Sequence, residues 1–459
     1  MTAMFVGETR KTLIFAAVAI VLAALALVTA PRKITPNAFL DQGEPFFPEF
    51  TDPNAARTLE VIDFDQDTGS AKPFKVTFKD GRWSIPSHHD HPADGKDRLA
   101  KTAAGVIGIR KDDFRTDNVS DHEACDVVDP LDETATSPKG RGQRVTIKGD
   151  NDLVLADFIV GKTVEGREDF RFVRVPGQKR VYAVRMDIDI STRFSDWIEA
   201  DLLGVEKDDI ERITLKDYSV NERTGQLNER DVVVLDREDA VWAANRMSDD
   251  QEVDMTKLGQ MLTTLDELKI EGVRPKPQGL SSRLTRSTDS LTITRTDMVS
   301  LQNKGYFFTR DGRLVSNEGE LLVTIGDAIT YTLRFGEIVY GSGLAVTAGT
   351  GAGGETNDGQ GENRYLFITT EFDRTGFPEP RSPANTNFLS RPDSVWTPDD
   401  RENKTLYDAH EKWLEKNRAR QKLSDGLNAR FANWYYVISA KSFEELRLTR
   451  RDVVRRKQS

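Results

Sequence analysis

The sequence repeats itself at an offset of 159 positions, and this repeat constrains the fold more than any other feature. Trp83 and Trp242 are paired at this offset, and an apolar pattern with helical spacing follows each tryptophan. Apolar residues spaced by three or four lie on one face of a helix, which can then cover a sheet. The core expected for the two copies is Trp83, Leu99, Val106, Ile109, Trp242, Leu258, Leu265 and Leu268.

Strand patterns surround both helices. In the first copy, residues 74–78 turn back at Asp80-Gly81, which is a two-residue hairpin signal. Alternating apolar segments follow in each copy, at 153–160 and at 329–335. We therefore predict an α+β fold with an N-terminal transmembrane helix, two duplicated strand-helix-strand units with antiparallel sheets, and a helical C-terminal segment.

The expected domain boundaries follow from these patterns and from local composition. The predicted order is a stub and anchor over 1–33, a first repeat over 55–200, a second repeat over 207–376 with a Gly-rich insertion at 341–363, a Pro-containing linker over 377–398, and a mostly helical segment over 399–459. Within this last segment, residues 431–438 predict a strand. Ser442 is expected to cap a final helix that runs from 443 to about 455.

An apolar run near the N-terminus contains no charged residue and extends from Thr12 to Ala30. A helix of this length spans ~28 Å, close to the thickness of the hydrocarbon core of a bilayer. We expect an uncleaved anchor, because cleavage as a secretory signal would leave Pro31 at the start of the mature chain. The residues expected to span the membrane are Thr12, Leu13, Ile14, Phe15, Ile20, Leu22, Leu25, Leu27, Val28 and Ala30.

The orientation of this anchor is less constrained. Two basic residues lie close to each end of the run, so the positive-inside rule hardly discriminates. A short stub before a large domain usually stays in the cytoplasm, which favours an inner-membrane protein with its bulk in a bacterial periplasm. Cytoplasmic exposure is the alternative. The net charge of −11 argues against nucleic acid as a partner, because phosphates require a basic surface.

No motif predicts a catalytic residue, a cofactor or a metal. Residues 349–354 match G-x-G-x-x-G, but the helix that would receive a pyrophosphate does not follow them. His88, His89 and His91 are expected to form a polar loop before a helix, since a metal site would need further ligands from elsewhere. The chain is therefore expected to be non-enzymatic, although an acid/base pair among its many carboxylates stays open.

The basic C-terminus has two interpretations. Six cationic side chains gather there, namely Arg447, Arg450, Arg451, Arg455, Arg456 and Lys457. We expect them to complement the dipole of the final helix. Contact with anionic lipid or with an acidic partner is the alternative.

Several segments resemble a bacterial membrane-protein family catalogued as domain of unknown function 4340. The resembling segments are 12–30, 80–85, 153–162, 170–177, 181–184, 197–203 and the unit 242–274. Members of this family are often associated with ABC-type transport components, including those of gliding motility. The resemblance therefore implies an accessory subunit, by association rather than by chemistry.

The expected function combines these observations. We expect a single-pass membrane protein whose ectodomain is an interaction module of a transport or envelope complex, with an ABC-type permease or ATPase as a possible protein partner. The alternatives are a membrane-tethered hydrolase that uses Asp and Glu residues in a cleft between the copies, and an envelope module that binds a ligand.

Overall fold

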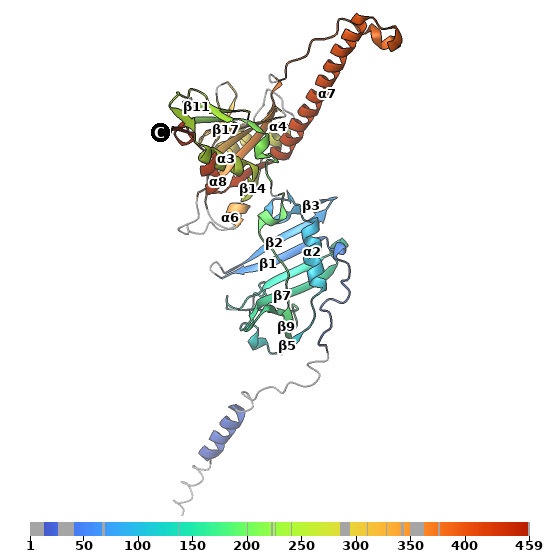
Figure 1. The fold of residues 1–459 in the computed structure, drawn as a ribbon. Coiled ribbons are helices and arrows are strands. Elements are labelled where there is room, and N and C mark those ends of the chain that lie inside the picture. The colour runs from blue at the N-terminus through green and yellow to red at the C-terminus, as the bar shows by residue number, and fades with distance from the viewer. Residues whose placement is uncertain are drawn as a thin grey trace, which may run out of the picture.

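Two β-sheet units lie end to end, and a long helix projects from the second unit (Figure 1). The computed structural model describes residues 13–25 and 41–457, apart from 67–68, 136, 200, 222–223, 225, 240, 285–293, 310, 327, 341–343, 349–361 and 375–376. The mixed α+β fold, the antiparallel sheets and a C-terminal helix, α7 (Pro398–Ala432), are as predicted from the sequence.

The first sheet has nine strands in the order β4-β3-β2-β1-β6-β7-β8-β9-β5, and every neighbouring pair is antiparallel. Helix α2 (Lys96–Ile107) follows β4 in the chain. The strands are β1 (Thr58–Asp65), β2 (Ser70–Lys79), β3 (Arg82–Ile85), β4 (His91–Pro92), β5 (Asp113–Thr116), β6 (Gln143–Lys148), β7 (Val154–Val164), β8 (Arg167–Arg174) and β9 (Val181–Arg185).

The second sheet has eight strands in the order β12-β11-β10-β17-β18-β19-β20-β14, which is the order of the first sheet from β3 to β5. Lys96 and Met255, the first residues of α2 and of α3 (Met255–Asp266), are 159 positions apart. The strands are β10 (Ile210–Asn221), β11 (Gln226–Glu238), β12 (Val241–Ala244), β14 (Gly272–Pro275), β17 (Glu320–Ile325), β18 (Ile329–Val339), β19 (Asn363–Phe372) and β20 (Trp434–Ile438).

Smaller elements complete the second unit. Strand β13 pairs with β21, and β15 pairs with β16. Their bounds, with those of the remaining helices, are β13 (Gln251–Val253), α4 (Gln278–Leu284), α5 (Arg295–Gln302), β15 (Tyr306–Phe308), β16 (Leu314–Ser316), α6 (Leu344–Thr347), α8 (Ala440–Leu446), α9 (Arg450–Val453) and β21 (Val454–Arg456). Of the expected Gly-rich insertion, only residues 344–348 and 362–363 are described.

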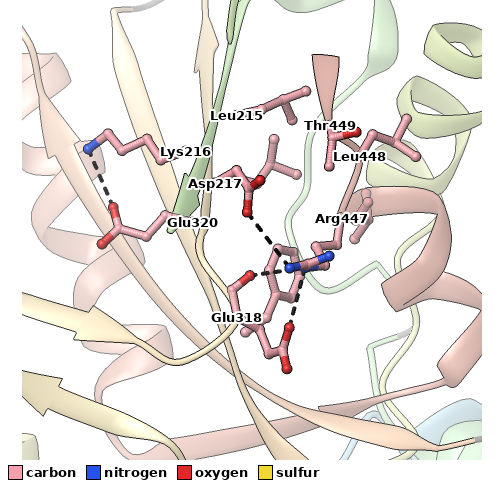
Figure 2. Close-up of a pocket in the computed structure, with 11 residues that line it drawn as sticks. Leu215, Lys216, Asp217, Glu318, Glu320, Arg447, Leu448 and Thr449 are labelled. Atoms are coloured by element: carbon pink, nitrogen blue, oxygen red, sulfur yellow. Dashed lines mark hydrogen bonds and ion pairs between the residues drawn. The ribbon is translucent and has the colours of Figure 1, made fainter. Parts of the chain in front are cut away.

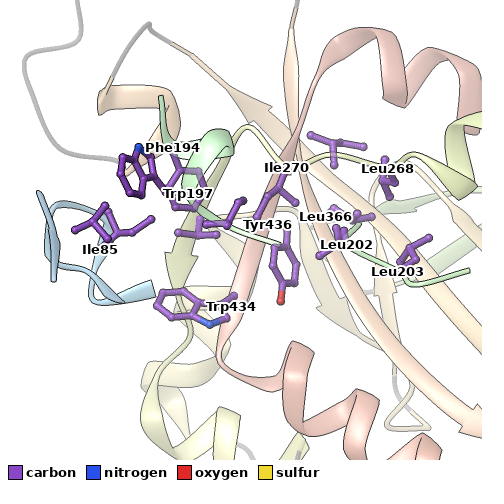
Figure 3. Close-up of a cluster of buried hydrophobic side chains, with 14 of the residues drawn as sticks. Ile85, Phe194, Trp197, Leu202, Leu203, Leu268, Ile270, Leu366, Trp434 and Tyr436 are labelled. Carbon is purple, nitrogen blue, oxygen red and sulfur yellow. The ribbon is translucent and has the colours of Figure 1, made fainter. Parts of the chain in front are cut away.

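One hydrophobic cluster extends through both units (Figure 3). It joins Ile85 and Trp197 of the first unit to Ile270 and Tyr436 of the second. The connection between the units is itself packed, because the amide of Leu202 donates to the carbonyl of Leu268 at 3.2 Å. Of the expected repeat core, Trp83 is partly exposed, whereas Leu99, Val106, Ile109, Trp242, Leu258, Leu265 and Leu268 are buried.

The N-terminal apolar run forms a helix over residues 13–25, whose side chains are exposed. Within the described part of the chain, no helix is both long enough and apolar enough to cross a membrane. Four of the residues expected to span the membrane, Thr12, Leu27, Val28 and Ala30, lie outside the described residues.

The C-terminal segment differs from the prediction. The expected helix from 443 to about 455 is wrong, since α8 ends at Leu446 and a separate α9 leads directly into β21. The side chain of Ser439 caps α8, and Ser442 donates its amide to it. Thr449 and Asp452 form a capping box that starts α9 anew, which is why one continuous helix does not form. Strand β20 joins the second sheet, which therefore extends beyond the expected boundary at 376.

Candidate functional site

A small cavity lies beneath the C-terminal segment of the second unit (Figure 2). Its volume is about 10 Å³, which leaves room for no more than one water molecule. The guanidinium of Arg447 points toward Asp217 and Glu318, with its Nε 3.4 Å from Glu318 Oε2. These ion pairs hold the C-terminal segment against the rest of the second unit. The cavity is a small gap beside this contact and is too small for a ligand.

Two of the other C-terminal cations also form ion pairs within the chain. Arg450 Nε lies 2.8 Å from Asp231 Oδ2, and Arg455 Nε lies 2.9 Å from Glu252 Oε1. These contacts hold α9 against β11 of the second sheet, and they hold β21 beside β13. Their main role in the fold is thus to pair with carboxylates of the second unit, an arrangement that neither interpretation of the basic C-terminus included.

A larger pocket of about 320 Å³ lies where the two units meet. Its walls contain Phe74, His88 and Phe194 from the first unit, with Glu271 and Thr347 from the second. The pocket therefore exists only because the units are packed together. The pocket lies where the sequence analysis placed a cleft between the copies, and it has room for a ligand of small-molecule size.

The histidine cluster forms part of this junction. His88 Nε2 lies 2.9 Å from Thr347 Oγ1, and His89 Nε2 lies 2.6 Å from the carbonyl oxygen of Ala348. The imidazole of His88 stacks on Phe194 with ring centres 4.4 Å apart. The sequence predicted a polar loop here, and its contact with residues some 259 positions away was not foreseen.

Burial sets the protonation state of these histidines. Desolvation lowers the pKa of His88 and of His91 to about 4, so both rings are neutral at pH 7. Neutral imidazoles can pack against aromatic rings without the cost of a buried charge. Among the described residues, no group of three or more His, Cys, Asp or Glu side chains is placed to hold a metal ion.

A projecting arm is the second candidate region. It consists of α7 and the preceding residues 373–397, which include nearly all of the linker predicted over 377–398. This preceding segment lies along the helix, since Trp413 Nε1 donates to the carbonyl of Phe377 at 2.9 Å. Further along, the amide of Ala384 donates to Asn403 Oδ1 at 2.7 Å.

The free end of the arm has its own small core. The ring of Phe388 contacts those of Trp396 and Tyr407, with centroids 5.9 and 5.8 Å apart. Thr397 and Asp400 form a capping box at the start of α7, with Pro398 in its first turn. Beside this core, Leu389 and Val395 are each 57% exposed. The tip is thus an ordered structure that presents apolar side chains to solvent.

The base of the arm is fixed to the second sheet. Lys276 is buried and donates from Nζ to the carbonyl oxygen of Phe431 at 3.0 Å, near the C-terminal end of α7. The carbonyl of Phe431 also accepts from the C-cap amide of Asn433, and a lysine near a helix C-terminus can add a hydrogen bond to such a carbonyl. The direction in which the arm projects is therefore set by contacts within the fold.

Sequence patterns did not reveal the arm because it is an insertion within a hairpin. In the first unit, β8 and β9 are joined by the short segment 175–180. In the second unit, the equivalent strands β19 and β20 are separated by the whole arm. The helical pattern and the capping residues of 397–432 were a signal for the helix. No residue, however, indicated with which strand the strand after it would pair.

Comparison with known proteins adds one relationship. No curated protein and no solved structure shows a significant match to the chain. A family model matches from Trp83 in β3 of the first unit to residue 283 in α4 of the second, so the arm lies outside the matched region. Over residues 83–283 the chain is therefore similar to the family described as Domain of unknown function (DUF4340), in agreement with the resemblance seen in its sequence.

Proposed function

We propose that this protein is a non-enzymatic accessory subunit that binds protein partners through its arm. The proposal places it at a bacterial inner membrane, anchored by the apolar run 12–30, with the bulk of the chain in the periplasm. The partner complex is a transport or envelope complex, with an ABC-type permease or ATPase as the expected component. The observation that carries the proposal is the arm, a fixed projection with exposed apolar side chains at its tip.

The length and surface of the arm support this function. A helix of 35 residues is about 52 Å long. Few of its residues are buried, and these are Asp400, Asn403, Ser424, Asn428, Phe431 and Ala432. A long helix that is polar nearly all round gains little from packing within its own chain. Its exposed surface is thus available to a second protein.

The membrane and transport parts of the proposal have a different basis. The anchor is supported by the absence of charge over residues 12–30 and by its length. The link to ABC-type transport comes from the family resemblance alone. The anchor is therefore tested separately from the arm. The experiment asks whether a chain that lacks residues 1–33 still sediments with inner membranes. Retention at wild-type levels would contradict the anchor.

Site-specific photocrosslinking in native membranes tests the arm. A photoreactive amino acid is placed at Leu389 or Val395 on the tip, and at Leu153 or Val241 as exposed control positions on the two units. We expect a discrete adduct with a transport or envelope protein from the tip positions only. The same adducts from the control positions, or no adduct from the tip, would contradict the proposal.

A ligand-binding function is the second candidate, and the junction pocket favours it. Asp63 and Glu271 line this pocket from opposite units, together with the apolar rings of Phe74 and Phe194. The test is a small-molecule screen by thermal unfolding, repeated with Phe194→Ala. A compound that raises the Tm of the wild type but not of this variant would support this candidate.

A further inference from the structure

The middle of the arm carries a groove of unusual charge. Its volume is about 440 Å³, and its walls include Trp413, Leu414, Arg418 and Lys422 of α7 together with Arg374 from the segment beside it. Three basic residues, Arg374, Arg418 and Lys422, and one acidic residue, Asp425, line it, in a chain whose net charge is −11. The groove is therefore a local positive surface on an acidic protein.

Two cations of the groove, Arg418 and Lys422, have no acidic partner in the described part of the chain. Arginines elsewhere are commonly paired with carboxylates, as Arg144 is with Asp157. Arg418 and Lys422 form no ion pair with any residue that the structure describes, and both are exposed. They stand one helical turn apart, so their charges point to the same side of α7.

The remaining walls supply apolar surface and order. The indole of Trp413 is held by its hydrogen bond to Phe377, and Arg374 donates to Gln421 Oε1 at 3.1 Å. Gln421 in turn donates to Asp425 Oδ1 at 3.0 Å, and Asp425 is the one acidic residue that lines the groove. The groove is thus pre-formed, which lowers the entropic cost of binding.

We propose that this groove binds an acidic segment of a partner protein that also carries an apolar side chain. The inference rests on the proposed function, since it names the chemistry of the partner. Carboxylates of the segment pair with Arg418 and Lys422, while its apolar side chain packs on Trp413 and Leu414. From Trp413 to Lys422 the helix rises ~14 Å, which matches about four residues of extended peptide.

The shape of the site favours a peptide over a lipid surface. A flat membrane meets a helix through a convex face with apolar side chains that insert between lipids. Here Trp413 and Leu414 lie in a groove beside Arg374, and both are only partly exposed. A single peptide strand can enter such a groove, whereas a bilayer cannot follow it.

The test uses two charge reversals on the same helix. The first variant, Arg418→Glu with Lys422→Glu, changes the groove. The second, Lys412→Glu with Lys416→Glu, makes the same change in charge and spacing at exposed residues that do not line it. The probes are an array of 12-residue peptides with four Glu and one or two Leu at varied positions, a matched array with Lys for Glu, and phosphatidylglycerol vesicles.

We expect wild-type protein to bind members of the acidic array and not the basic array. Binding to these members falls at least tenfold in the groove variant and changes less than twofold in the control variant. Equal losses in both variants, or no acidic peptide bound, would overturn the inference. Vesicle binding that depends on the groove, without peptide binding, would overturn it in favour of lipid. If the groove inference fails in one of these ways but the arm tip still crosslinks to a transport or envelope protein, the proposed function remains supported.

Discussion

The side chain of Asn428 in α7 forms two hydrogen bonds with the main chain of Thr370 in β19. Its Oδ1 accepts from the amide at 2.8 Å, and its Nδ2 donates to the carbonyl at 2.7 Å. Strand β20 pairs with β19 only from Arg364 to Leu366, so Thr370 lies beyond the paired part. The amide group therefore takes the place of a strand, and the base of the arm covers an open sheet edge.

Replacement of Asn428 by alanine should weaken this connection. Both polar groups of Thr370 would lose a partner in a buried position, so we expect the free energy of unfolding to fall by about 2–4 kcal/mol. Urea denaturation measures the change. Asn385→Ala, at an exposed position in the arm, should cost less than 1 kcal/mol. A loss as small at Asn428 would show that solvent replaces the two hydrogen bonds.

Lys276 should give the stability a distinctive dependence on pH. Complete burial lowers the pKa of its ammonium group well below 10.5, and Arg334 adds to this effect. Between the folded and unfolded pKa values the unfolded chain binds the proton and the folded chain does not, so stability rises with pH in this window. The slope is at most about 1.4 kcal/mol per pH unit.

The comparison is with Lys276→Met, a residue of similar length that cannot titrate. We expect the free energy of unfolding of the wild type to increase relative to this variant as the pH rises from 7 toward 10. Guanidinium denaturation at several pH values measures the difference. A difference that is constant with pH would mean that the amine remains charged over its aromatic neighbours, Phe367 and Tyr435.

The repeated part of the fold was readable from the sequence because its signals are local. The spacing of Leu258 and Leu265 predicts a helix with one buried face, and α3 occupies that segment. Likewise, the alternation over 153–160 corresponds to β7. The periodicity of apolar residues shows which face of a helix or strand is buried, whichever element packs against that face.

Contacts between distant segments were not readable in this way. Of the strand predicted over 431–438, residues 434–438 form β20, whereas 431 and 432 end α7. Nothing in the pattern indicated pairing with β19 across the arm. Similarly, the sequence predicted a polar loop at His88, but not its contacts with Phe194 and Thr347. Partners of this kind are set by tertiary packing, and a single sequence does not record them.

The buried histidines should make the junction sensitive to acid. Their pKa values of about 4 lie below the ordinary value of 6.5, first because of desolvation, and for His88 also because of the neighbouring His91 and His89. As the pH falls from 6.5 toward 4, the unfolded chain takes up protons that the folded chain excludes, so stability is lost in this window. Each histidine contributes up to about 1.4 kcal/mol per pH unit.

His88→Gln tests this origin of the acid sensitivity. We expect the variant to lose less stability than the wild type between pH 6.5 and 4.5 in urea denaturation. An identical decline in the two proteins would assign the acid sensitivity to other groups instead.

The arm also offers a position where the helix can be strengthened without new contacts. Gly426 lies inside α7 next to the anchoring residues, and a Cβ added there would meet no atom within 4 Å. Alanine loses less backbone entropy than glycine in a helix, so Gly426→Ala should raise the free energy of unfolding by about 0.5–1 kcal/mol.

Gly319 provides the opposite case. Its φ is +85°, and a Cβ would lie 2.6 Å from the carbonyl oxygen of Lys216, so Gly319→Ala should destabilise the protein. Thermal unfolding compares the two variants with the wild type. Because the contacts of Asn428 fix the arm at its base, Gly426→Ala should leave crosslinking from Leu389 unchanged. Loss of those adducts in a stabilised variant would instead mean that α7 must bend at residue 426 for the tip to reach its partner.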